Sequence, residues 1–220
     1  MRVAAMAVLA AVLAGGSAAA QTAPAPVAAA GQTAPAPAAD KAWSFSATAA
    51  IYFPPEDDAY VQPTVTADRG RLHLEGRFNY EDLDTGSAWI GINFSAGDAV
   101  SLEITPMFGA VFGNTTAIAP GYKGTLAWRR IELYSETEYV INAGESADSF
   151  LYTWSELSFA PADWCRLGAV IQRTKLYETS FDIQRGVFLG VSYGRADVTA
   201  YYFNPGTSNA MFVLGFGVGF

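Results

Sequence analysis

Charged side chains recur two residues apart in the central part of this sequence. Glu75 and Arg77 form one such pair, and Glu136 and Glu138 form another. Because successive side chains of a β-strand point to opposite faces, both members of each pair share a face if these segments are strands. Buried charges are costly unless they are paired or hydrated, so that face must hold water or matched ion pairs.

Applied to the whole chain, the alternation predicts one cluster of charges on the inner face of a closed sheet. Its acidic members outnumber its basic members, so a water-filled interior would prefer cations. An interior that these residues close through mutual ion pairs is the alternative, and both interpretations stay open. The cluster consists of Glu75, Arg77, Glu81, Glu103, Lys123, Glu132, Glu136, Glu138, Glu156 and Arg166.

His73 is the one histidine of the chain and the one candidate for a catalytic base. With Glu75 two positions further on, it could serve a lipid hydrolase as a general base. It follows the predicted turn at Gly70 by three residues, which puts it near one rim of the sheet. We expect it to be a hydrogen-bonding residue at that rim, and we expect no catalytic residues.

The sequence predicts neither a metal site nor a cofactor. The single cysteine, Cys165, excludes an internal disulfide and a cysteine-rich metal site. The acidic residues of 56–58 and 81–84 lack the ordered spacing of a calcium loop, so we expect them to be solvated. The net charge of −8 argues against a nucleic-acid partner, which requires a basic surface.

Turn signals recur about every thirty residues, the length of a hairpin with two strands of about 10–12 residues. One set lies at 68–70, 96–98, 129–130, 161–163 and 194–196, and the opposite set at 54–58, 81–85, 113–116, 142–149, 177–180 and 204–208. Five turns and six loops connect twelve strands, and an even number brings both ends of the sheet to one side.

Two further patterns describe these strands. Aromatic residues gather at strand ends in two rings, as in interfacial girdles. The first ring is Trp43, Phe94, Trp128, Phe159, Trp164, Tyr193 and Phe220, and the second is Phe53, Tyr80, Phe112, Tyr139 and Tyr177. Pro63, Pro106 and Pro120 fall inside predicted strands, where they remove ladder hydrogen bonds, so we expect bulges or bends there.

The last ten residues alternate large apolar side chains with small ones. Phe212, Leu214, Phe216, Val218 and Phe220 share one face, and the other face is mostly glycine. Such a strand fits a barrel wall with lipid on one side and a crowded interior on the other. It resembles the last strand of bacterial outer-membrane β-barrels, in which a terminal aromatic and alternating apolar residues form the signal for the assembly machinery. A strand of a buried sandwich is the alternative.

Residues 1–20 have the pattern of a secretory signal peptide. Arg2 precedes an apolar core from Val3 to Leu13, and small residues precede Gln21, so cleavage is expected after Ala20. Residues 21–41 repeat Gln-Thr-Ala-Pro-Ala-Pro and are typical of a tether with no core to bury. The barrel is expected over 42–220, with both of its ends on the periplasmic side.

The sequence therefore predicts an all-β, antiparallel, up-and-down barrel of about twelve strands in the outer membrane. The mean hydropathy of +0.17 fits such a barrel, because alternation dilutes its apolar residues. A narrow porin-like diffusion channel that passes small hydrophilic solutes or ions and prefers cations is the expected function. An outer-membrane lipid hydrolase using His73 and a non-conducting structural barrel are the alternatives.

Overall fold

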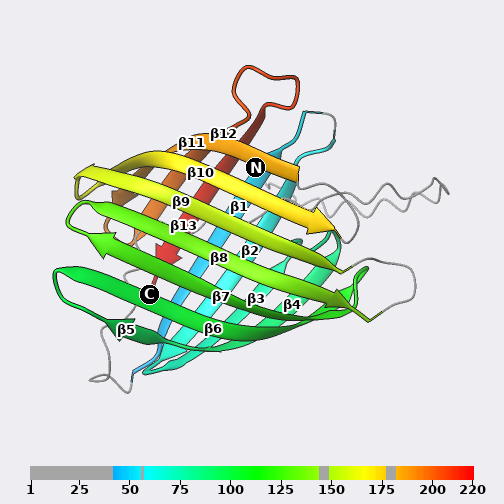
Figure 1. Cartoon of the computed structure of the whole chain (residues 1–220), viewed down its shortest axis with the longest axis horizontal. Coiled ribbons are helices and arrows are strands. Elements are labelled where there is room, and N and C mark those ends of the chain that lie inside the picture. The colour runs from blue at the N-terminus through cyan, green and yellow to red at the C-terminus, as the bar shows by residue number, and fades with distance from the viewer. Residues whose placement is uncertain (1–41, 56, 144–148, 177–181) are drawn as a thin grey trace, which may run out of the picture.

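The computed structural model describes residues 42–55, 57–143, 149–176 and 182–220 as a closed antiparallel β-barrel (Figure 1). The predicted signal peptide and tether (1–41), much of the 142–149 loop and all of the 177–180 loop lie outside these residues. No helix long and apolar enough to cross a membrane occurs in the described part of the chain. The strands are β1 (Ser44–Phe53), β2 (Tyr60–Arg69), β3 (Leu72–Phe78), β4 (Thr85–Ile92), β5 (Phe94–Ala96), β6 (Val100–Gly113), β7 (Ala117–Trp128), β8 (Ile131–Asn142), β9 (Phe150–Ala162), β10 (Cys165–Leu176), β11 (Asp182–Tyr193), β12 (Ala196–Phe203) and β13 (Met211–Gly219).

These thirteen strands form a barrel of twelve, because β4 and β5 are two parts of one strand. Both pair with β6 in a single register, from Gly91 opposite Met107 to Phe94 opposite Ile104. The ladder with β6 skips Ile92 and Asn93, which lie opposite Pro106 and Thr105, and the proline cannot donate a ladder hydrogen bond. The predicted number of strands is therefore confirmed, and the proline breaks the partner strand instead of forming a bulge.

The other two prolines also lie beside gaps in the ladder. The β7–β8 ladder skips Pro120, and the β2–β3 ladder begins only after Pro63. The register does not shift at either proline, so of the predicted bulges or bends no bulge forms there. The bulge between β9 and β10 instead lies near Arg166, where Ala160 and Pro161 together face this one residue.

The barrel is closed by its first and last strands. β1 pairs with β13 from Ser46 opposite Gly219 to Phe53 opposite Phe212. Beyond that ladder, the backbones of Phe45 and Phe220 exchange two hydrogen bonds of 2.9 Å. The alternation that marked the C-terminal stretch therefore describes the seam strand of the barrel.

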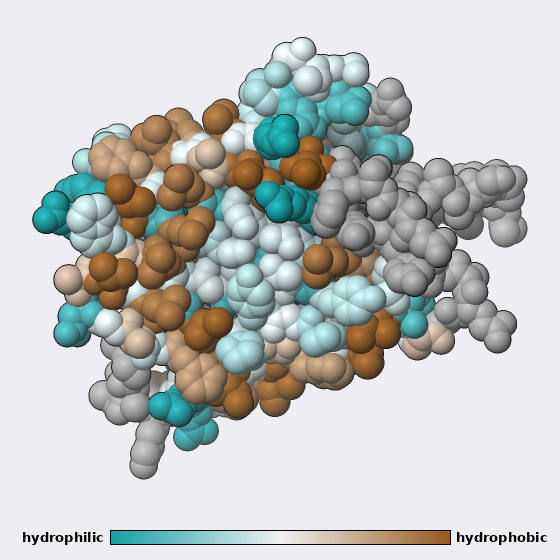
Figure 2. Space-filling view, in the orientation of Figure 1, coloured by the Kyte–Doolittle hydropathy of each residue, from teal (hydrophilic) through white to brown (hydrophobic). Residues whose placement is uncertain are grey.

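The outer wall is largely apolar, as alternation predicted. Large hydrophobic residues from every part of the sheet are exposed on it, including Ile90, Phe108, Leu157 and Phe216. Figure 2 shows these apolar areas on one side of the barrel, together with a paler area near its middle. Hydroxyl groups on the wall form hydrogen bonds with one another between β8 and β9, as Ser135 does with Ser155 at 3.1 Å.

Aromatic packing fills part of the interior. Trp154, Tyr201 and Phe203 are fully buried, and the Trp154 ring meets the other two at 5.4 and 5.5 Å between ring centroids. Tyr52 stacks on Tyr60 at 5.0 Å. These rings come from β1, β2, β9 and β12, so they line one side of the interior beside the charged side chains described below.

Candidate functional site

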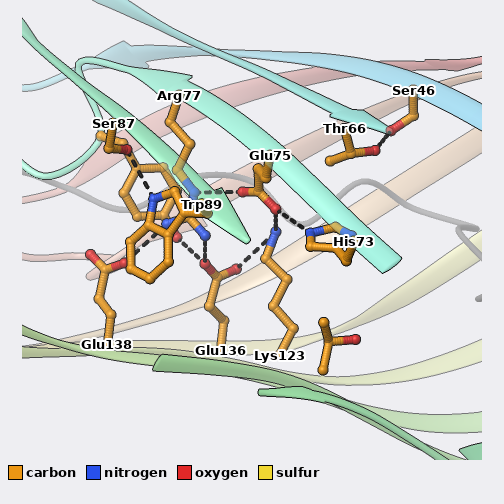
Figure 3. Close-up of polar contacts among 12 residues, drawn as sticks. Ser46, Thr66, His73, Glu75, Arg77, Ser87, Trp89, Lys123, Glu136 and Glu138 are labelled. Carbon is orange, nitrogen blue, oxygen red and sulfur yellow. Dashed lines mark hydrogen bonds and ion pairs between the residues drawn. The ribbon is translucent and has the colours of Figure 1, made fainter. Parts of the chain in front are cut away.

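Arg77 on β3 is the centre of a charged cluster inside the barrel (Figure 3). Its Nε donates to Glu75 Oε1 at 2.5 Å, its Nη2 to Glu136 Oε1 at 2.8 Å and its Nη1 to Glu138 Oε2 at 3.0 Å. β3 supplies the first acid and β8 the other two, on strands that do not pair with each other. The guanidinium therefore ties two separate parts of the wall together across the interior.

Two aromatic rings cover the guanidinium of Arg77. Its central carbon lies 3.9 Å from the centroid of the Tyr80 ring and 4.5 Å from that of Trp89. Such cation–π contacts gain strength where water is excluded. The Tyr80 hydroxyl also donates to Glu136 Oε1 at 2.5 Å, so this tyrosine faces inward. The prediction that Tyr80 belongs to the outer aromatic ring was wrong, because the chain leaves the strand at Asn79 with a positive φ of 56°.

Lys123 on β7 is the second base of the cluster. Its Nζ donates to Glu75 Oε2 and lies 3.9 Å from Glu136 Oε2. Its side chain is 22% exposed, whereas those of Glu75 and Arg77 are 0% and 1% exposed. Lys123 is thus the most accessible member of an otherwise dry cluster.

Glu81 joins the cluster from the connection between β3 and β4. Its Oε1 accepts from Ser87 at 2.6 Å and from Trp89 at 3.3 Å, and it lies 3.9 Å from Arg77 Nη1. Its Oε2 is buried without a hydrogen-bond partner. Burial raises the pKa of the Glu81 carboxyl, and the nearby Arg77 charge opposes that rise.

The remaining predicted charges form a second, smaller group. Arg166 donates to Glu156 Oε2 at 2.7 Å, and Tyr201 donates to Glu156 Oε1 at 2.8 Å. Glu132 lies on the inner face of β8 and is itself exposed. It is within electrostatic range of this pair and of the half-buried Glu103. The structure therefore brings six of the ten predicted residues together around Arg77 and places the other four apart from it.

His73 lies between two carboxylates at the edge of the Arg77 cluster. Its Nδ1 is 2.8 Å from Asp68 Oδ1 and its Nε2 is 3.0 Å from Glu75 Oε2. Both ring nitrogens are therefore engaged with acids, which leaves neither to take a proton from a nucleophile. This is the hydrogen-bonding arrangement that we expected for His73.

Two inward acids were missed by the sequence reasoning. Asp68, the penultimate residue of β2, lies beside His73, and the sequence had placed it in a turn. Asp197 shares the inner face of β12 with the buried Thr199 and Tyr201, and its carboxylate covers Gly217 of β13. The alternation of β12 could have revealed Asp197, whereas Asp68 becomes an inner residue only because β2 extends into the turn.

The described residues contain no group of three or more histidines, cysteines or acids that could hold a metal ion. Around Arg77 the carboxylates bind several different bases and hydrogen-bond donors, and they do not converge on one point. Asp82, one of the acids weighed for calcium, accepts from Thr115 at 2.8 Å while Glu81 turns inward. The acids of the β3–β4 connection therefore do not act together.

The sequence matches no protein-family model and no curated protein at a significant level. Solved structures are similar in fold. A KdgM porin superposes with a TM-score of 0.59 and 12% identity, covering 79% of this chain and 98% of the porin. A KdgM porin in complex with disordered oligogalacturonate has the same TM-score and coverage, with 9% identity. Together with the closed barrel and its apolar wall, this likeness shows that the chain has the fold of outer-membrane β-barrel porins.

Proposed function

We propose that this barrel is a narrow porin-like channel that prefers cations, with the Arg77 cluster as its constriction. The charge of the interior carries the proposal. Among the side chains that the structure describes, nine inward acids face three permanent bases. The acids are Asp68, Glu75, Glu81, Glu103, Glu132, Glu136, Glu138, Glu156 and Asp197, and the bases are Arg77, Lys123 and Arg166.

The size of the barrel supports a narrow passage. Side chains fill a barrel of eight strands, and sixteen strands leave a wide aqueous channel. With twelve strands the interior is intermediate, and here side chains cross it at the level of Arg77. The cluster is almost fully buried, so passage requires its side chains to move apart. Lys123 and Glu132, which are more exposed, mark the wetter part of the interior.

The sign of the charge also indicates which solutes are excluded. One similar porin was solved with oligogalacturonate, which is a polyanion. An interior with three times as many acids as bases repels a polyanion, and a confined passage strengthens that repulsion. We therefore infer that small cations pass this barrel in preference to anionic oligosaccharides.

Recording in planar bilayers tests the proposal. In a tenfold gradient of KCl, an ideally cation-selective channel shows a reversal potential of about 59 mV, and we expect a value of the cation-selective sign. Replacing Glu136 and Glu138 by glutamine removes two acids at the constriction and should move the reversal potential toward zero. Asp163→Asn, an exposed acid in the β9–β10 turn, is the matched control and should leave it unchanged.

A non-conducting structural barrel is the second candidate, and the burial of the Arg77 cluster favours it. Hydrogen-bonded ion pairs that exclude water can serve to fix the positions of β3, β7 and β8. The same recordings separate the two functions. Reconstituted barrels that are folded but give no conductance would support the structural role, and a preference for anions would overturn the assigned charge of the passage.

A lipid hydrolase is not supported by the geometry at His73. A serine or cysteine nucleophile needs a base nitrogen within hydrogen-bonding distance, and both nitrogens of His73 lie against Asp68 and Glu75 instead. Replacing His73 by glutamine should therefore leave any solute flux of the barrel in place.

A further inference from the structure

The Arg77 cluster holds more acids than its bases can neutralise. The cluster has four acids and two bases, so two negative charges are uncompensated if all six groups are ionised. The acids are Glu75, Glu81, Glu136 and Glu138, and the bases are Arg77 and Lys123. His73 adds no compensation, because Asp68 balances it. Since uncompensated charge is very costly in a dry site, the cluster needs a further positive charge.

The uncompensated charge is concentrated on one side of Arg77. Its Nη1 lies 3.0 Å from Glu138 Oε2 and 3.9 Å from Glu81 Oε1, so these two carboxylates flank a single nitrogen. Glu75 and Glu136 each have further donors, from Lys123 and from two tyrosines respectively. Glu81 Oε2 has none, and the residue is 3% exposed.

A second buried oxygen without a partner points to the same place. Tyr152 on β9 pairs directly with Glu138 on β8, and both side chains face inward. The Tyr152 hydroxyl has no hydrogen-bond partner although the residue is 3% exposed, and it lies within electrostatic range of Glu138 and Glu136. The hydroxyl is therefore a second buried oxygen without a hydrogen-bond partner on the Glu138 side of the cluster.

We propose that Glu81, Glu138 and the Tyr152 hydroxyl bind one monovalent alkali cation. Oxygen ligands can replace the hydration shell of such an ion, and its charge would reduce the excess of the cluster. The inference rests on the proposed cation preference of the interior and identifies a binding site for the cation within it.

The test measures the apparent unfolding temperature of the full chain in detergent, at pH 8 and constant ionic strength. Potassium chloride replaces choline chloride, whose cation is a bulky quaternary ammonium ion. Because a ligand that binds only the folded state stabilises it, the wild type should melt at higher temperatures as potassium increases. Glu81→Gln, Glu138→Gln and Tyr152→Phe should each lose at least half of this shift.

Glu132→Gln is the matched control, because Glu132 lies on the same strand as Glu138 but outside the cluster. It should keep the full potassium shift. The proposal is overturned if the wild type melts equally in both salts, or if Glu81→Gln and Glu138→Gln keep the shift. It is also overturned if acidification stabilises the protein while potassium does not, since a proton would then be the occupant.

This experiment is independent of conduction. A barrel that shows the potassium shift but no current would retain the cation site and refute the channel. A barrel that conducts cations but shows no potassium shift would retain the channel and refute the cation site.

Discussion

Arg77 lies in an environment unlike that of a surface arginine, because its charged group is removed from water. Its guanidinium is buried among Glu75, Glu136 and Glu138 and lies against two aromatic rings. Removing one partner from a buried ion pair leaves the other charges uncompensated, which costs far more than the pair contributes when it is intact. The energetic importance of Arg77 therefore comes from the acids that its removal would leave behind.

Replacing Arg77 by methionine should reduce the free energy of unfolding by about 3–5 kcal/mol, the usual cost of breaking a buried pair. Arg130→Met is the matched control, because Arg130 forms an exposed pair with Asp163 at 3.6 Å. Its loss should change stability by less than about 1 kcal/mol. Urea unfolding of the folded barrel in lipid vesicles measures both, and equal effects would show that the cluster is hydrated.

The inward direction of the charged residues was predictable from alternation, but their partners were not. Glu75 and Arg77 lie two residues apart, so the sequence could place them on one face. The bonds from Arg77 to Glu136 and Glu138 span about sixty residues of chain and depend on strand tilt and barrel closure, which the periodicity of the sequence does not reveal. Tyr80 was misplaced because one residue with positive φ, Asn79, moved the chain out of the alternation.

At the scale of the strands, regular alternation identified the elements well and irregular positions poorly. The turn between β7 and β8 was predicted at 129–130, where the structure has it, whereas β2 extends through Arg69 into the turn predicted at 68–70. The break between β4 and β5 was not predicted, because its cause, Pro106, lies on the neighbouring strand. The sequence shows which strand contains a proline. It does not show which residues of the neighbouring strand lose a hydrogen bond, because that depends on how the two strands are paired.

β13 carries the predicted assembly signal, and Phe220 follows it directly. The Phe220 ring stacks on Phe45 at 6.0 Å between ring centroids, and the two backbones are hydrogen-bonded. We expect Phe220→Ser to reduce the amount of heat-modifiable folded barrel in the outer membrane by several-fold, because recognition of the unfolded chain precedes burial of the ring. Electrophoresis of heated and unheated membranes measures the folded fraction.

Phe94→Ser is the control for Phe220→Ser. Phe94 is an exposed aromatic of β5 that was predicted in the same ring, so its replacement removes a comparable area of apolar surface. If both variants assemble equally poorly, loss of interfacial area explains the defect and Phe220 has no special role in recognition.

At the scale of the whole molecule, the even number of strands puts the two ends of the sheet on one side. The predicted signal peptide and tether make that side the periplasm, so the connection between β12 and β13 should face the cell exterior. A protease tag inserted at Ser208 in this connection should be cleaved on intact cells. A tag at Asp163 in the β9–β10 turn should be cleaved only after the outer membrane is opened, and equal cleavage at both sites would contradict the orientation.

The pairing of β1 with β13 has a consequence for the rate of folding. Each of the other ladders joins strands that are neighbours in sequence, whereas this one joins Ser46 to Gly219. Bringing such distant segments together costs chain entropy before any hydrogen bond forms, and long-range contacts slow folding. We therefore expect seam closure to be the slowest step, with two open edges exposed until it occurs. Introducing cysteines at Ala47 and Val218, which are paired across the seam, and timing their crosslinking against hairpin formation would measure that delay.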